Sequence, residues 1–316
     1  MAPLISIIIA AYNAEGYLAQ TLQSVLDQSF TRFECLVMND GSKDGTYEVA
    51  RSFAARDRRI RVLQQPNTGV STARNNALAQ SDASAPFVVF LDSDDVWLDD
   101  ALQVLFDALE ADPNAVGAHA LAELIDSQGE PIQPGEFSSF GRNRTTLRGR
   151  RFVPLAEDKP TTFEVVITQG LIFPPGLALL RKGAVERAGG FDPTLTSQED
   201  WDLWIRLTRS GDFVFVPRVV IWYRRHEASA TQNHSESFRQ AAIVRHRIFY
   251  SPENTPAQAN AARRSYRALQ AWRIAEKKGA IIYHLRRRQL VPALLACGRI
   301  AGNFARFVRG FPTLHG

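Results

Sequence analysis

The sequence has little of what disulfide-stapled or membrane-spanning proteins depend on. It contains two cysteines, Cys35 and Cys297, which stand far apart and match no metal-ligand spacing. We therefore expect neither a disulfide framework nor a cysteine-based zinc site, and a reducing compartment is the simpler assumption. No apolar run approaches the roughly 18 residues of a membrane span. The first basic residue is Arg32, so a signal peptide is not expected at the start.

Internal repeats are also missing, and the composition is that of a globular protein. Hydrophobic residues make up 45% of the chain and charged residues 22%, which excludes a disordered, collagen-like or low-complexity chain. A length of 316 residues indicates one large domain with an appendage, or two domains.

The charge is unevenly distributed along the chain. The net charge is +4, but residues 224–316 carry 17 Lys/Arg and 4 Asp/Glu, whereas residues 1–223 carry 20 basic and 29 acidic residues. An acidic body with a basic tail indicates that the tail meets something anionic, such as phospholipid, nucleic acid or an anionic substrate.

Strand and helix patterns alternate over the first 115 or so residues. Leu4–Ala11 is a continuous apolar run, as expected for a strand that is covered on both faces. The expected strands are 4–11, 33–38, 60–63 and 87–91, and the expected helices are 18–26, 46–56, 70–79 and 102–109. Repeated units of this length predict an α/β fold with a mostly parallel, Rossmann-like sheet and helices on both sides.

The second half of the chain is less regular. Residues 127–160 are polar and contain prolines and glycines, which predicts a long loop or insertion. Regular structure is expected again at 171–180 and in a helix at about 199–209. Two short strands are expected around Pro217, and from about residue 235 the pattern is helical and rich in arginine.

The sharpest local feature is Asp92-Ser93-Asp94-Asp95, at the end of an expected buried strand. Ligands of open α/β sheets bind at the carboxyl ends of strands. Three carboxylates this close together need a cation, and their hard oxygen atoms suit Mg²⁺ or Mn²⁺. The alternative is a solvated acidic turn that caps the next helix.

Two further turns follow expected strands. Asp40, in the turn Asn39-Asp40-Gly41-Ser42, can accept hydrogen bonds from a base N–H or a ribose hydroxyl. Gly69 opens a helix whose amino end favours an anion, and Arg74 lies one turn inside it, where it can reach a phosphate or brace an aspartate. Ordinary turn and cap chemistry, and a surface Arg–Asp pair, are the alternatives.

The last feature is Glu199-Asp200-Trp201. Two carboxylates beside a large aromatic residue can serve as a general base next to an apolar platform for a sugar ring. The alternative is favourable placement of negative charge at the start of a helix.

Together these features resemble the GT-A fold, family 2 glycosyltransferases. The resemblance covers roughly residues 4–230 and departs at Ala10, where the family often has proline. No Gln-x-x-Arg-Trp motif of the processive synthases is present, which favours a single transfer per binding event. The segments that carry the resemblance, in the family's order, are Ser6–Asn13, Asn39–Ser42, Gly69–Asn75, Phe90–Asp95 and Glu199–Trp201.

The resemblance implies a domain division and roles for matching positions. A catalytic domain would span 1–230, with a nucleotide-binding half at 1–115 and an acceptor half at 116–230, followed by a basic α-helical region at 231–316. Asp200, with Glu199 beside it, would be the catalytic base. The implied nucleotide-sugar contacts are Ala11, Tyr12, Asn13, Asp40, Arg74, Asp92, Ser93, Trp201 and Arg224. The implied ligands of Mg²⁺ or Mn²⁺ are Asp92, Asp94 and His226, although a lone histidine is also often structural.

The predicted function is inverting, metal-dependent transfer of a sugar from a nucleotide diphosphate sugar to an acceptor hydroxyl. The resemblance favours a UDP-sugar and a glycan or lipid-linked acceptor, in surface glycan or glycolipid assembly, with a cytoplasmic location or a peripheral one on the inner face of the membrane. The oligomeric state stays open, and a dimer is compatible with the sequence.

Two other functions are the alternatives to glycosyl transfer. A sugar-phosphate nucleotidyltransferase usually carries a Gly-rich, basic loop after the first strand, where this chain has Tyr12-Asn13-Ala14-Glu15-Gly16. A non-enzymatic nucleic-acid or membrane-binding protein would have no use for acidic turns at the ends of its strands, so this function does not explain them. Aromatic residues interleaved with basic ones are not evident, so nucleic acid is not an expected partner.

The end of the tail has the pattern of a basic amphipathic helix. Arg299 and Arg306 lie opposite an apolar stripe, and such a helix can lie in a membrane interface. The alternative is that the stripe packs on the catalytic domain or on a second subunit. The stripe consists of Leu290, Leu294, Cys297, Ala301, Phe304 and Val308.

Overall fold

The computed structural model describes residues 2–148, 151–227 and 234–286. Its strands are β1 (Ile5–Ala11), β2 (Phe33–Asp40), β3 (Ile60–Gln65), β4 (Phe87–Phe90), β5 (Val96–Trp97), β6 (Gly117–Ile125), β7 (Pro131–Ile132), β8 (Thr145–Arg148), β9 (Arg151–Pro154), β10 (Ala178–Arg181) and β11 (Phe213–Arg224). Its helices are α1 (Leu18–Leu26), α2 (Thr46–Ala54), α3 (Val70–Ala79), α4 (Ala101–Glu110), α5 (Glu136–Arg142), α6 (Phe163–Thr168), α7 (Lys182–Arg187), α8 (Glu199–Leu207), α9 (His234–Tyr250) and α10 (Pro256–Arg286), with a 3-10 turn η1 at Pro175–Leu177.

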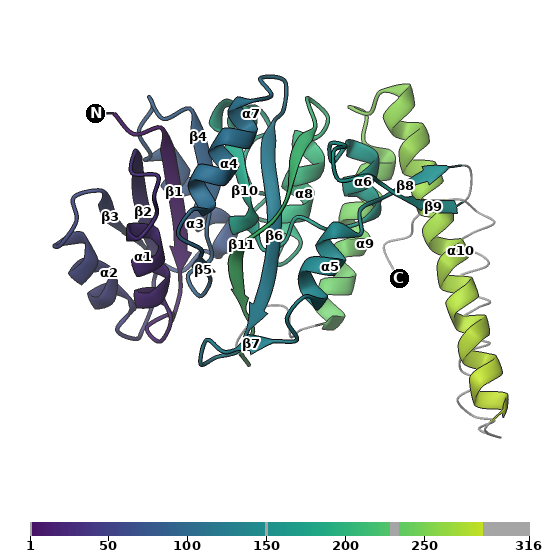
Figure 1. Ribbon diagram of the computed structural model, residues 1–316, viewed down its shortest axis with the longest axis horizontal. Coiled ribbons are helices and arrows are strands. Elements are labelled where there is room, and N and C mark those ends of the chain that lie inside the picture. Colours follow the sequence, from purple (N-terminus) through teal and green to yellow (C-terminus); the bar gives the residue numbers. More distant parts are fainter. Residues whose placement is uncertain (1, 149–150, 228–233, 287–316) are drawn as a thin grey trace.

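A nine-stranded sheet runs through the molecule in the order β3-β2-β1-β4-β10-β6-β11-β5, and β7 pairs with β6 (Figure 1). The first four strands of this order are parallel to one another, as are β6 and β11. Strand β10 lies antiparallel between β4 and β6, and β5 lies antiparallel to β11. The predicted α/β sheet flanked by helices is confirmed, with its parallel part concentrated in the first half of the chain.

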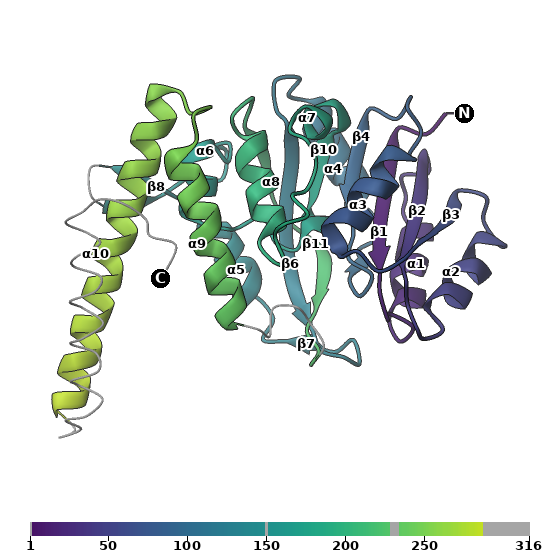
Figure 2. The same ribbon diagram turned by 180° about the vertical axis from the view of Figure 1, so that it is seen from behind.

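Strand β1 shows why the sheet needs covering on both faces. Ile5, Ile7 and Ile9 are fully buried among the side chains of α1 and α4, whereas Ile8 is buried in a second cluster that includes residues of α3 and α8. Side chains alternate across a strand, so a run of isoleucines supplies both cores at once. Helices α1, α2 and α4 lie on one face, and α3, α8 and α9 lie on the other, as the two opposite views show (Figures 1 and 2).

The expected loop at 127–160 contains short elements instead, namely β7, α5, β8 and β9. Arg144 organises this region because its fully buried guanidinium donates to the carbonyls of Ala156, Glu157 and Lys159. Because a buried arginine holds this hairpin, its strands need no regular alternation of apolar and polar residues, and the sequence pattern does not reveal them. Similarly, the two strands expected around Pro217 are one strand, β11, whose register shifts between Phe215 and Val219.

Helix α9 and the start of α10 pack on the body of the protein. Ala241, Val244 and Ile248 of α9 are buried in the cluster that also holds Trp201. Helix α10 begins after Thr255, whose hydroxyl accepts a hydrogen bond from the amide N–H of Gln258. No helix in the described ranges is both long and apolar enough to cross a membrane. The apolar stripe expected at 290–308 lies outside the described residues.

Candidate active site

A cavity of about 710 Å³ opens where the carboxyl ends of β1, β2 and β4 meet the start of α8. The parallel strands bring Ala11, Asp40 and Asp92 to one edge of the sheet, and α8 places Glu199 and Asp200 opposite them. Five carboxylates and one guanidinium line the cavity, which makes it a strongly acidic site. The lining residues are Ala10, Ala11, Tyr12, Asp40, Asn67, Gly69, Val70, Arg74, Asp92, Ser93, Asp94, Gly170, Ile172, Phe173, Pro175, Thr196, Ser197, Gln198, Glu199, Asp200, Trp201, Tyr223 and Ser237.

Arg74 of α3 joins the two sides of the cavity. Its Nη2 donates to Asp92 Oδ1 at 2.6 Å and its Nη1 donates to Glu199 Oε1 at 2.8 Å. The side chain is only 4% exposed and lies over the ring of Phe191. Burial by itself lowers the pKa of the Arg74 guanidinium, but Asp92 and Glu199 outweigh it and raise that pKa. Arg74 is therefore a permanent positive charge that fixes the position of two carboxylates.

Asp92 and Asp94 lie at the end of β4, as the sequence predicts, and both line the cavity. Burial raises the pKa of Asp92, and the nearby charge of Asp94 raises it further, against the effect of Arg74. Asp94 Oδ2 lies 2.8 Å from Nε2 of His226, whose ring stacks on Tyr17 with centroids 4.6 Å apart. His226 therefore reaches Asp94, although it is not among the residues that line the cavity.

The fourth residue of the acidic turn, Asp95, does not line the cavity and supports the turn from inside the protein. It is fully buried and its Oδ1 accepts the backbone N–H of Arg224. The guanidinium of Arg224 is also buried, and it donates to the carbonyls of Asp94 and Asp126 and to the side chain of Gln20. Arg224 does not line the cavity, so the structure places this predicted nucleotide-sugar contact behind the acidic turn, where it holds the backbone of that turn.

Asp40 lies at the end of β2 with its carboxylate turned toward the start of α3. Its Oδ1 accepts the N–H of Thr68 and its Oδ2 accepts the N–H of Gly69, both at 2.9 Å. The φ of Gly69 is +90°, a conformation that favours glycine. Asp40 thus holds the loop before α3 and borders the cavity at the same time.

The residues after β1 divide between the cavity and its outer edge. Tyr12 lines the cavity and is exposed, whereas Asn13 turns the chain with a φ of +49° and does not line it. The side chain of Asn13 accepts the N–H of Lys43, and its own N–H donates to the hydroxyl of Ser42. Ser93 lines the cavity, and its carbonyl accepts the hydroxyl of Thr21.

Glu199 and Asp200 open α8 but have different surroundings. The carboxylate of Glu199 is held by Arg74. Asp200 accepts the N–H of Trp201 at 2.6 Å. Burial raises the pKa of Asp200 to about 7, and the charge of Glu199 contributes to the rise. A carboxylate with a pKa near neutrality is well matched to accepting a proton. Asp200 therefore has the properties of a general base, and Glu199 those of a bound structural anion.

Trp201 begins an apolar wall of the cavity. It lines the cavity, and its ring N–H donates to the carbonyl of Val166 at 2.7 Å. Apolar and aromatic side chains that the sequence did not single out continue this wall, namely Ile172, Phe173, Pro175 and Tyr223. Hydroxyl and amide side chains face the cavity from the loop before α8 and from α9, namely Thr196, Ser197, Gln198 and Ser237.

Most of these wall residues carry no sequence signal, because they lie in loops or at single positions of helices and strands. Gln198 is the most unusual of them, since it has a φ of +62°. A non-glycine residue in this conformation often marks a functional site. A positive φ is visible only in a structure, so sequence reasoning could not find it.

Donor groups in the cavity and directly beside it fit a divalent cation. Asp94 and His226 offer a carboxylate oxygen and an imidazole nitrogen side by side, and Mn²⁺ accepts both. Among the described residues, no group of three or more His, Cys, Asp or Glu side chains is arranged to hold an ion. Cations in phosphate sites are commonly held by one or two carboxylates, with water and phosphate completing the shell. The residues therefore suit an ion that shares its coordination with a bound diphosphate.

Part of the chain is similar in sequence to known proteins. A relative from Bacillus subtilis (strain 168), the "Putative teichuronic acid biosynthesis glycosyltransferase TuaG", is 42% identical over 102 residues, which are 32% of this chain and 40% of that protein. The chain thus spans well under two thirds of that relative's length.

Solved structures resemble the whole chain in fold. The mannosyltransferase PcManGT from Pyrobaculum calidifontis, in complex with GDP-Man and Mn²⁺, has a TM-score of 0.60 at 17% identity and covers 98% of this chain and 88% of that one. Residues 1–349 of S. aureus TarS, in complex with UDP-GlcNAc, have a TM-score of 0.57 at 18% identity and cover 94% and 90%. The sequence model described as "Glycosyl transferase family 2" matches residues 6–164, which is half of the chain, and the chain belongs to that family.

Proposed function

We propose that the protein is an inverting glycosyltransferase that moves a sugar from a nucleotide diphosphate sugar, with a UDP-sugar favoured, to an acceptor hydroxyl. The observation that carries the proposal is the meeting of Asp92, Asp94 and Asp200 in one cavity, although more than a hundred residues separate the first two from the third. Family membership supports the reaction class.

In this proposal the acceptor hydroxyl gives its proton to the carboxylate of Asp200. The acceptor oxygen then forms a bond to the anomeric carbon, and the bond between that carbon and the diphosphate breaks. One base on the acceptor side is what a single in-line displacement with inversion requires. Glu199 is bound to Arg74, so we assign it and Arg74 to positioning rather than to proton transfer.

Mg²⁺ or Mn²⁺ would be held by Asp94 and His226, with Asp92 beside them, and would supply positive charge to the diphosphate when bound. The protein itself offers little else for this purpose, because Arg74 is the one cationic side chain that lines the cavity in the described part of the chain. The guanidinium of Arg74 is already shared between two carboxylates.

The acceptor side supports a sugar-containing acceptor. Trp201, Phe173 and Tyr223 give apolar and aromatic surface, and hydroxyl and amide groups lie at its edge. This combination suits the two faces of a carbohydrate, one apolar and one rich in hydroxyls. We propose a glycan or a lipid-linked acceptor, with peripheral contact of the basic C-terminal region at the cytoplasmic face of a membrane. Co-sedimentation with anionic liposomes at low and high salt, with and without residues 280–316, tests that contact.

A donor screen tests the reaction. Several nucleotide sugars are incubated with the protein and Mn²⁺, and release of the nucleoside diphosphate is followed. At least one should be hydrolysed or transferred, and removal of the ion with a chelator should stop the release. Failure of every donor, in the presence of a sugar acceptor panel, would contradict the proposal.

Substitution of the proposed base gives the sharper test. Asp200→Asn should lower kcat by roughly 10²–10⁴-fold, the range expected for loss of a general base. Glu199→Gln keeps a hydrogen-bond acceptor for Arg74 and should cost less. A larger loss in Glu199→Gln than in Asp200→Asn would reverse the two assignments.

A further inference from the structure

The segment Asp192–Gln198 carries the acceptor side of the site, yet it contains no helix or strand. It leads directly into Glu199 and Asp200, and three of its own residues line the cavity. Its exact path therefore decides where the proposed base lies relative to the acceptor.

Helix α3 holds the two ends of this segment. At the near end, the side chain of Asn75 accepts the N–H of Phe191 and donates to its carbonyl, at 2.9 and 2.8 Å. At the far end, Arg74 holds Glu199. The seven residues between these anchors need a separate support.

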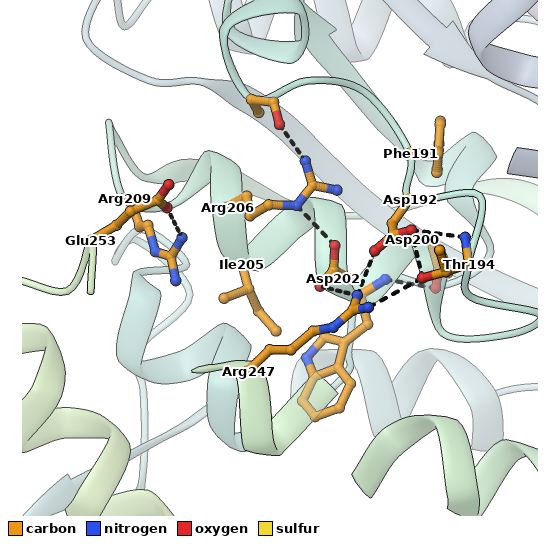
Figure 3. Close-up of polar contacts among 12 residues, drawn as sticks. Phe191, Asp192, Thr194, Asp200, Asp202, Ile205, Arg206, Arg209, Arg247 and Glu253 are labelled. Atoms are coloured by element: carbon orange, nitrogen blue, oxygen red, sulfur yellow. Dashed lines mark hydrogen bonds and ion pairs between the residues drawn. The ribbon is translucent and has the colours of Figure 1, made fainter. Parts of the chain in front are cut away.

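Helix α9 supplies that support. The guanidinium of Arg247 donates to Asp192 Oδ2 at 2.5 Å and to the hydroxyl of Thr194 at 3.1 Å (Figure 3). About two turns before Arg247 on the same helix, Gln240 Nε2 donates to the hydroxyl of Thr196 at 2.9 Å. Among the described residues, every hydrogen bond from another element to the side chains of residues 192–198 comes from α9.

These contacts lie along one side of α9. Glu236 accepts the hydroxyl of Thr196 at 2.8 Å and the amide of Gln240 at 2.7 Å. Residues 236, 240 and 247 are separated by four and seven positions, which places them on the same face of a helix. The adjacent stripe of Val244 and Ile248 is buried in the second core cluster, so the polar row is fixed in place by packing.

Gln240 is only 2% exposed. A buried amide is costly unless it is hydrogen-bonded, and the amide nitrogen of Gln240 donates to both Thr196 and Glu236, so it ties the loop to α9. The next residue along the helix face toward the site, Ser237, itself lines the cavity. Helix α9 therefore lines the cavity and also supports the adjacent loop before α8.

We infer that α9 is a positioning element of the site, in which Gln240 and Arg247 hold the Asp192–Gln198 segment so that Asp200 faces the acceptor. The catalytic part of this inference rests on the proposed function. The structural part, that α9 restrains the segment, does not.

Two variants and one matched control test the inference. Gln240→Leu keeps the side-chain volume and removes the donor, and Arg247→Ala removes a partly exposed side chain, so both should fold. Arg218→Ala is the control, because Arg218 is also a partly exposed arginine with a 2.5 Å bond to an aspartate, Asp100, which lies directly before α4. Arg247→Lys, which keeps the charge, serves as the conservative variant.

Hydrogen exchange of peptides that cover residues 192–198 is measured first. Both variants should raise exchange there relative to the wild type, and Arg218→Ala should not. Equal exchange in all proteins would overturn the inference. This readout needs no substrate, so it stands even if the protein turns over no nucleotide sugar, a result that would contradict the proposed function instead.

Kinetics with donor and acceptor are measured second. Misplacement of a catalytic group by about 1 Å can cost roughly 10²-fold, so kcat should fall about 10- to 100-fold in both variants. The KM for the donor should stay within about twofold, because the nucleotide is held by the first half of the chain, and Arg247→Lys should recover part of kcat. A wild-type kcat in both variants, or a change confined to the donor KM, would overturn the positioning role.

Discussion

Arg74 is the buried charge around which the carboxylates of the site are arranged. It lies between Asp92 and Glu199, which come from opposite sides of the cavity. Removal of one partner from a buried ion pair leaves the other charges uncompensated, which costs far more than the pair itself contributes. Because one side chain serves two carboxylates, its loss affects the acidic turn and the start of α8 together.

Arg74→Ala should therefore lower the free energy of unfolding by about 3–5 kcal/mol. Arg74→Lys should cost less, since it keeps the charge but cannot present two donors in a fixed plane. Urea unfolding at neutral pH measures both. The exposed pair of Arg218 and Asp100 gives the comparison, since Arg218→Ala should cost about 0–1 kcal/mol. A similar small cost for Arg74→Ala would contradict the central position of this residue.

The pKa of Asp200 predicts how activity depends on pH. Its value of about 7 lies above the ordinary carboxyl range because of burial and the neighbouring Glu199. The ionised form accepts the proton, so kcat should rise about tenfold per pH unit below pH 7 and level off above it. The same raised pKa disfavours the folded state as pH rises from about 4 to 7.

A pH profile of kcat at saturating donor and acceptor measures this. Thermal unfolding over the same range separates loss of the base from loss of the fold. An activity that stays constant down to pH 5 would contradict Asp200 as the base.

At the scale of elements, the segment before α8 depends on a tight approach to α3. Gly190 has a φ of +67°, and a Cβ there would lie 2.5 Å from the side-chain oxygen of Asn75. That oxygen accepts the N–H of Phe191. A side chain at position 190 would therefore strain the backbone and displace the contact that holds this end of the segment.

Gly190→Ala should lower the free energy of unfolding by roughly 1–2 kcal/mol, the cost of placing an L-residue in the left-handed conformation. Loss of the hydrogen bonds to Asn75 should lower it by about 1 kcal/mol more. Gly189→Ala is a matched control, because Gly189 has a φ of +81° but no atom within 4 Å of its Cβ position. It should show the backbone cost alone. Chemical denaturation compares the two, and equal costs would show that Asn75 adjusts freely.

At the scale of the whole molecule, the sequence predicts the features that depend on hydrophobic periodicity, namely the strands and helices of the first half, and the residues that follow the ends of strands. The buried run of β1 and the acidic turn after β4 predict which edge of the sheet carries Ala11, Asp92 and Asp94, because parallel strands end at one edge of a sheet. The wall of the cavity that α8, α9 and the loop before α8 form could not be predicted in the same way. Gln198 adopts a left-handed conformation, and Ser237 reaches the cavity because α9 packs in the same cluster as Trp201.

Arg224 illustrates the same limit from the other side. The family resemblance implies that Arg224 contacts the nucleotide sugar, but in the structure its guanidinium is buried and donates to the backbone carbonyls of Asp94 and Asp126. A sequence shows that an arginine lies near an active-site segment. It does not show toward which side of that segment the side chain turns.

Ligand binding by the whole protein gives the last prediction. A ligand that binds only the folded state stabilises it by about 2.7 kcal/mol at a hundredfold excess over its Kd. For a protein of this size that corresponds to a rise of several degrees in Tm. A nucleoside diphosphate sugar with Mn²⁺ should produce this rise, because the acidic cavity accepts a diphosphate only together with a cation. The sugar nucleotide without the ion should give little change, since five carboxylates line the cavity.

A nucleoside triphosphate with Mn²⁺ and a short DNA duplex are the comparisons. A transferase should respond to them less than to the nucleotide sugar, whereas a nucleotidyltransferase would respond most to the triphosphate and a nucleic-acid binder to the duplex. The Asp94→Ala variant separates binding in the cavity from binding elsewhere, because its response to the nucleotide sugar with Mn²⁺ should disappear. A full shift in that variant would mean that the ion and the diphosphate bind outside the cavity.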